Sequence, residues 1–153
     1  GYSTGNDAID SNGNLYINGG NVFAYSQACG AEVAIDANTE GGYKLYVQGG
    51  TIVAYPSLER GSSLTQSCYK GTLSTGTWYS FSDGGTAYAF KVPRAGSWVV
   101  SSAAGKLYSV AKDGGTNVFG DYGVVDATVS GGTAVSLSAY TESGNSGAPG
   151  GWR

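Results

Sequence analysis

An eleven-residue stretch of the sequence occurs twice, at positions 30 residues apart. LYINGGNVFAY at 15–25 returns as LYVQGGTIVAY at 45–55, with the leucine, both glycines and both tyrosines kept. Each copy alternates apolar and polar side chains around a Gly-Gly pair, which is the pattern of a β-strand that bends sharply. One such strand cannot bury its apolar face alone, whereas stacked copies form a continuous core. The repeat therefore predicts strands that stack in parallel, with equivalent residues above one another.

A shorter match lies upstream of each copy. DAIDSN at 7–12 corresponds to VAIDAN at 33–38, and a loop around TEGG at 39–42 absorbs the difference in offset. A unit of this length suits one coil of a parallel β-helix, in which equivalent residues lie about 4.8 Å apart. The stacking predicts four neighbouring pairs: Tyr16 and Tyr46, Tyr25 and Tyr55, Asn18 and Gln48, and Ile9 and Ile35.

The rest of the chain has short, evenly spaced apolar runs and no helical periodicity, so we expect an all-β fold. The coils of a parallel β-helix, a short solenoid, are clearest over 5–56. A long loop is expected at 57–77 and an irregular, partly antiparallel β part at 78–140. Residues 1–140 would form a single β domain, and the Gly/Pro-rich stretch 141–153 a flexible tail. The strands expected in the later part are 78–82, 86–92, 97–101, 106–110, 116–119, 124–129 and 133–138.

Composition excludes several classes of function. The net charge is −3 and the eight lysines and arginines are scattered singly, so we expect no nucleic-acid partner. No apolar run approaches the ~20 residues of a membrane span, so no membrane insertion is expected. The chain has no histidine, which excludes Ser-His-Asp, Cys-His and histidine-metal chemistry. We expect a protein without catalytic activity; a polysaccharide lyase that uses calcium and a lysine or arginine base is the minor alternative.

The two cysteines, Cys29 and Cys68, have no CxxC partner and no histidine nearby. The Gly/Ser/Thr/Tyr-rich, charge-poor composition is typical of an extracellular protein and favours a Cys29–Cys68 disulfide. Two buried free thiols are the alternative. We expect the protein to be secreted or displayed at the cell surface.

Acidic and amide residues gather at the two stacked corners. They are Asp7, Asp10 and Asn12 at the first corner, and Asp36, Asn38 and Glu40 at the second. Calcium takes six to eight oxygen ligands from carboxylates, amides, carbonyls and water, and these corners could supply about half of them. The alternative is that the aspartates only accept backbone N–H bonds at turns.

The chain has 12 tyrosines, more than a small core needs, and strand alternation places several of them outward. An exposed aromatic face gives a flat apolar platform with a polar edge, which suits a sugar ring. The candidate carbohydrate-binding residues are Tyr16, Tyr25, Tyr46, Tyr55 and the nearby cation Lys44, with Trp78 and Tyr79 as weaker candidates. The alternative is that the tyrosine ladders only cover and stabilise the sheet.

NDAIDSNGNLYINGGNVFAY, its second copy and the PGGW near the end resemble the carbohydrate-binding-domain family of bacterial cell-surface proteins. The resemblance implies a secreted, right-handed parallel β-helix of the pectate-lyase-like type, with calcium between coils and acidic polysaccharide as ligand. Our leading hypothesis is therefore an extracellular, non-catalytic module that binds pectin-like or plant cell-wall glycans. The alternative is a structural subunit of an extracellular fibre, a homo-polymer assembled head-to-tail through open β-helix ends.

Overall fold

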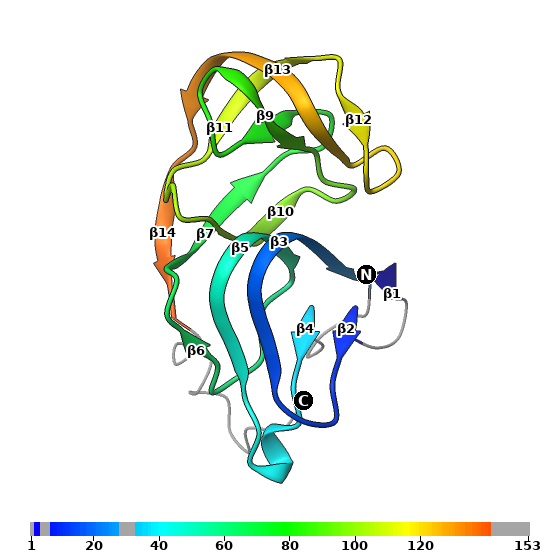
Figure 1. Ribbon diagram of the computed structural model, residues 1–153, viewed down its shortest axis with the longest axis vertical. Helices are drawn as coiled ribbons and strands as arrows, with labels where there is room; N and C mark the ends of the chain where they lie inside the picture. The colour runs from blue at the N-terminus through cyan, green and yellow to red at the C-terminus, as the bar shows by residue number, and fades with distance from the viewer. Residues whose placement is uncertain (1, 4–6, 28–32, 142–153) are drawn as a thin grey trace. The chain divides into compact units, whose positions relative to one another are not determined.

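The computed structural model describes residues 2–3, 7–27 and 33–141 of the chain (Figure 1). Within these residues the regular structure is β-strand, apart from one 3-10 turn, η1 (Thr39–Gly41). The predicted all-β class is confirmed, and no helix in this part is long and apolar enough to cross a bilayer. Of the predicted tail, residues 142–153 lie outside the described part. The strands are β1 (Tyr2–Ser3), β2 (Ile9–Asp10), β3 (Leu15–Ser26), β4 (Ile35–Asp36), β5 (Leu45–Tyr55), β6 (Ser63–Leu64), β7 (Cys68–Leu73), β8 (Trp78–Ser80), β9 (Gly85–Phe90), β10 (Gly96–Ser101), β11 (Tyr108–Asp113), β12 (Thr116–Asn117), β13 (Gly123–Ala134) and β14 (Leu137–Tyr140).

The residues group into two compact units. The first unit comprises 1–70, 98–103 and 139–153, and the second comprises 71–97 and 104–138. The sequence predicts one β domain over 1–140; in the structure the later strands instead divide between these two groups. Each unit is described by itself below.

In the first unit the two copies of the repeat pair in parallel. Strand β3 lies beside β5 with Tyr16 opposite Tyr46 and Tyr25 opposite Tyr55. Strand β2 lies beside β4 with Ile9 opposite Ile35. Figure 1 shows both pairs, with β3 and β5 following the same curve. These three predicted pairs are confirmed, and the offsets of 30 and 26 residues are those read from the sequence.

The fourth predicted pair is wrong, because the register slips at the bend. Asn18 lies opposite Gly49 instead of Gln48, and the ladder is irregular between Ile17 and Asn21. The slip coincides with the Gly-Gly corner, where Gly20 and Gly50 adopt φ values of +78° and +87°. Such values are accessible to glycine at little cost, so the bend concentrates there.

Beyond the bend, strand β5 is buried on both faces: Ile52, Val53 and Ala54 have no exposed surface. Strand β10 pairs antiparallel with this segment and brings in Trp98, which is also fully buried. Its ring packs against those of Tyr25 and Tyr55 and of Phe23. The alternation in this half of the repeat therefore does not separate a core face from a solvent face.

The segment predicted as a long loop, 57–77, contains two strands, β6 and β7, and this part of the prediction is wrong. Ser63 and Leu64 of β6 pair in parallel with Tyr46 and Val47, and Leu58 bridges to Ile35. The segment thus forms a shorter third layer on the repeat. Its polar composition hid this role, because pairing on the edge of β5 satisfies backbone groups whatever the side chains are.

The far end of the described chain returns to the first unit. The Tyr140 hydroxyl accepts a hydrogen bond of 3.1 Å from the backbone N–H of Leu58, 82 residues away. Tyr140 is buried in the cluster that holds Ile35, Leu58 and Val99. The core of this unit therefore contains residues from three separated parts of the chain.

The second unit is a five-stranded sheet of order β11-β8-β9-β13-β12, and its pairings are antiparallel. Because β11 also pairs with β13, the sheet closes on itself. Its buried residues include Tyr79, Phe90, Val124 and Val129. The strands lie close to those predicted for 78–138.

Candidate metal centre and aromatic binding face

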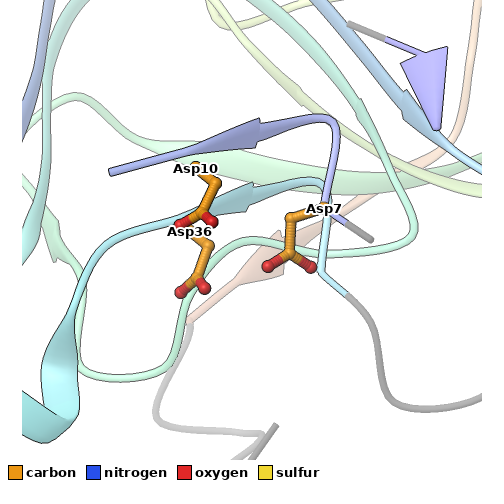
Figure 2. Close-up of side chains that lie close together, drawn as sticks. All are labelled: Asp7, Asp10 and Asp36. Atoms are coloured by element: carbon orange, nitrogen blue, oxygen red, sulfur yellow. The ribbon is translucent and has the colours of Figure 1, made fainter. Parts of the chain in front are cut away.

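Three aspartates converge at one corner of the first unit. The parallel register of β2 and β4 places Asp10 opposite Asp36, and Asp7 lies just before β2. One carboxylate oxygen from each of the three lies within 4.8 Å of the others. Figure 2 shows the Asp10 side chain above that of Asp36, with the Asp7 carboxylate beside them. The repeat thus brings together carboxylates that are 26 or more residues apart in the sequence.

The electrostatics of this corner are those of an uncompensated acidic cluster. Asp36 Oδ1 is buried and has no hydrogen-bond partner among the described residues. Burial raises the pKa of the Asp36 carboxyl above its ordinary value, a hydrogen bond with Asp7 acts in the opposite direction, and the charge of Asp10 raises it again. Asp7 Oδ1 accepts a hydrogen bond of 2.9 Å from the backbone N–H of Val33, which orients its carboxylate. A hard divalent cation suits three converging carboxylates with an orphaned oxygen.

The other predicted ligands have different surroundings. Asn38 Oδ1 accepts from the backbone N–H of Gly41 at 3.0 Å, which caps η1. Asn38 Nδ2 donates to the carbonyl oxygen of Asn12 at 3.1 Å. The Asn38 amide is therefore used as a turn cap, as in the alternative interpretation. Glu40 lies exposed in η1, outside the group of three carboxylates.

Calcium is expected to raise the thermal unfolding midpoint of the wild-type protein and to leave that of Asp36→Asn nearly unchanged. A cation that binds only the folded state adds about 2.7 kcal/mol at a free concentration 100 times its Kd. The measurement is unfolding followed by circular dichroism, with calcium and with EDTA. Asp121→Asn, which changes an exposed carboxylate outside the cluster, should respond as the wild type does. Equal stabilisation of wild type and Asp36→Asn would contradict a metal at this corner.

The same pair of proteins has an expected pH dependence in EDTA. Because the folded-state pKa of Asp36 is raised, its contribution to stability is present below its ordinary pKa and is lost as pH rises through the raised value. The wild type should therefore lose stability relative to Asp36→Asn between acidic and neutral pH. Calcium should reverse this difference.

Two of the four candidate tyrosines form an exposed stack. The rings of Tyr16 and Tyr46 are parallel, with centroids 4.7 Å apart and an interplanar angle of 7°. Tyr16 is 54% exposed, more than any other large hydrophobic residue of the described part, and Tyr43 beside Lys44 is 43% exposed. Lys44 is exposed as well. This face of β3 and β5 offers aromatic surface beside a cation.

The other two candidate tyrosines are not available as a platform. Tyr25 is buried, with 7% of its surface exposed, and Tyr55 is half-buried. Their rings pack edge-to-face on each other and against Trp98. The prediction that they face solvent is wrong for Tyr25, because a strand from much later in the chain covers this half of the repeat.

Cys68 is a buried free thiol in this structure, which is the alternative to the predicted disulfide. Burial raises the pKa of the Cys68 thiol, whose Sγ donates toward the carbonyl oxygen of Gln66 at 3.6 Å. It packs in the first unit's core with Leu58 and Val99. Its predicted partner, Cys29, lies outside the described residues.

The sequence did not single out two lysines that stand over Trp78 in the second unit. Lys91 and Lys112 place their ammonium nitrogens 5.1 and 4.7 Å from the centre of that ring. Antiparallel pairing brings these residues together, and no sequence motif marks them. Comparison with known proteins adds no functional assignment, since no family model, curated protein or solved structure matches the chain.

Proposed function

We propose that the protein is an extracellular, non-catalytic module that binds acidic, pectin-like or plant cell-wall polysaccharide. Its first unit would be part of a right-handed parallel β-helix, with calcium held by Asp7, Asp10 and Asp36. The observation that carries the proposal is the exposed stack of Tyr16 and Tyr46. The parallel pairs with offsets of 30 and 26 residues support the β-helix.

The stacked pair suits a sugar for two reasons. The open face and edges of Tyr16 provide apolar surface for the C–H groups of a pyranose ring, and the phenol groups can hydrogen-bond sugar hydroxyls. Packing on Tyr46 also fixes the Tyr16 ring before a ligand arrives, so little side-chain entropy is lost on binding. Lys44 would attract the carboxylates of an acidic glycan.

Calcium would contribute electrostatically as well as structurally. The protein carries a net charge of −3, and three converging carboxylates form a negative field that repels a polyanion. A divalent cation at this corner would neutralise most of that local charge. Calcium would therefore favour both the folded repeat and its acidic ligand.

The test is isothermal titration of polygalacturonate and of soluble cello-oligosaccharide, with calcium and with EDTA. Tyr16→Ala is expected to weaken binding about tenfold, which corresponds to roughly 1.4 kcal/mol. Tyr122→Ala, which removes an exposed tyrosine of the second unit, is the matched control and should bind normally. If the wild type binds neither glycan in calcium, the proposal is wrong. Release of reducing ends would instead indicate an enzyme.

The fibre alternative has less support. Head-to-tail growth requires two open ends, and one side of β5 is occupied by β3 while the other is occupied by β6 and β10. On β3, strand β1 covers only Tyr25 and Ser26 on the side away from β5, as far as the described residues go. One open edge favours a monomeric module over a polymer, and sedimentation at high concentration measures the difference.

A further inference from the structure

Trp78 lies between two lysines on one face of the closed sheet in the second unit. Strand β8 holds Trp78 opposite Val110 of β11. On its other side, Tyr79 lies opposite Phe90 of β9, so Trp78 faces Lys91, the residue after that strand. Lys112 lies two residues beyond Val110 and therefore shares its face. Both lysines thus approach the indole ring from its two neighbouring strands.

The two ammonium groups are close together and carry no counter-charge in the structure. Their nitrogens are 5.1 and 4.7 Å from the Trp78 ring centre, so their separation cannot exceed the sum of these two distances. Lys112 Nζ donates to the carbonyl oxygen of Gly114 at 3.3 Å. No carboxylate of the described residues forms an ion pair with either lysine, and the neighbouring Asp113 alternates to the opposite face.

The indole ring explains how two like charges are held here, and also what is missing. The negative face of a tryptophan ring attracts cations, which offsets part of their mutual repulsion. Both lysines and Trp78 are half-buried, so their charges are less screened by water than at a fully exposed site. Such a pair gains from an anion that contacts both nitrogens. In a chain with a net charge of −3, this is a local reversal of sign.

We propose that Trp78, Lys91 and Lys112 form a binding site for the carboxylate groups of an acidic glycan. This inference rests on the proposed function and names a second contact for the same ligand class. A polyuronate offers a carboxylate on each sugar, so adjacent sugars can contact the two ammonium groups. The exposed part of the indole ring contacts their C–H groups. Because lysine is a compact point charge, recognition depends on the charge of the sugar and weakens with salt.

The experiment compares the wild type with Lys91→Gln/Lys112→Gln, which keeps the length and polarity of both side chains. Lys106→Gln changes an exposed lysine of the same unit and is the matched control. Each protein is titrated with oligogalacturonate, with the fully methyl-esterified oligomer of the same length, and with oligogalacturonate at raised salt. Circular dichroism and the thermal midpoint verify folding, and the two single variants replace the double variant if it does not fold.

The double variant is expected to bind oligogalacturonate about tenfold more weakly, with a smaller salt dependence, while binding of the esterified oligomer stays unchanged. The Lys106→Gln variant should match the wild type. Unchanged affinity of the double variant for oligogalacturonate overturns the inference, and if Tyr16→Ala still weakens binding, the proposed function stands without it. Equal losses for the charged and the esterified oligomer also overturn it, because charge would not be what is recognised. Absence of binding by the wild type overturns both proposals.

Discussion

Replacing Trp98 with alanine is expected to lower the free energy of unfolding by about 3–5 kcal/mol. The side chain is fully buried, and its ring centre lies 5.1 Å from that of Tyr55 and 5.7 Å from that of Tyr25. Truncation would leave a cavity lined by aromatic rings on paired strands. Because β3, β5 and β10 are fixed by their ladders, the cavity cannot collapse fully. Urea unfolding followed by circular dichroism measures the loss.

Trp98→Phe is the control for this prediction. Phenylalanine retains a ring against Phe23 and the two tyrosines, so the smaller cavity should cost about half as much or less. A loss below about 1 kcal/mol for Trp98→Ala would contradict the close packing of this cluster, since such values are typical of surface substitutions.

Replacing Gly50 with alanine is expected to cost about 2–5 kcal/mol, from two additive causes. The residue has a φ of +87°, which is strained for any side chain. An added Cβ would also lie 2.9 Å from the carbonyl oxygen of Gly20 and 3.0 Å from the carbonyl carbon of Gly19. These are backbone atoms of the adjacent strand, so relief requires the parallel ladder of β3 and β5 to open.

Gly20→Ala is the matched control, because the repeat places the same residue type at the equivalent position. Its φ is +78°, but a Cβ there would meet nothing within 4 Å. It should therefore cost only the backbone strain, about 1–2 kcal/mol. The difference between the two variants measures how closely the strands approach at the bend. Equal losses would mean that the contact with Gly19 and Gly20 is not restrictive.

The parts of the fold and site that follow from the repeat were predictable, and the parts that depend on later strands were not. The stack of Tyr16 on Tyr46 and the meeting of Asp10 with Asp36 follow from an offset visible in the sequence. The covering of Tyr25 by Trp98 does not, because β10 matches no repeat and is placed only by packing. The strand pairing at 63–64 was hidden for a similar reason, since backbone bonds form it.

The cation pair on Trp78 illustrates a further limit of sequence reasoning. Its two lysines are 21 positions apart and belong to strands that flank β8 on opposite sides. Only the order of strands in the closed sheet brings them to one ring. By contrast, the aspartate corner needed only the repeat, and the structure added the orphaned oxygen of Asp36 and the capping role of Asn38.

The hydrogen bond from Leu58 to Tyr140 has a consequence for synthesis on the ribosome. The first unit's core includes residues 98–101 and Tyr140, which emerge long after the two copies of the repeat. Until they arrive, the nascent chain carries paired strands whose apolar faces are uncovered, and such surfaces invite association with other chains. Completion of this core is therefore a late event, and the second unit's strands are translated before the first unit can close.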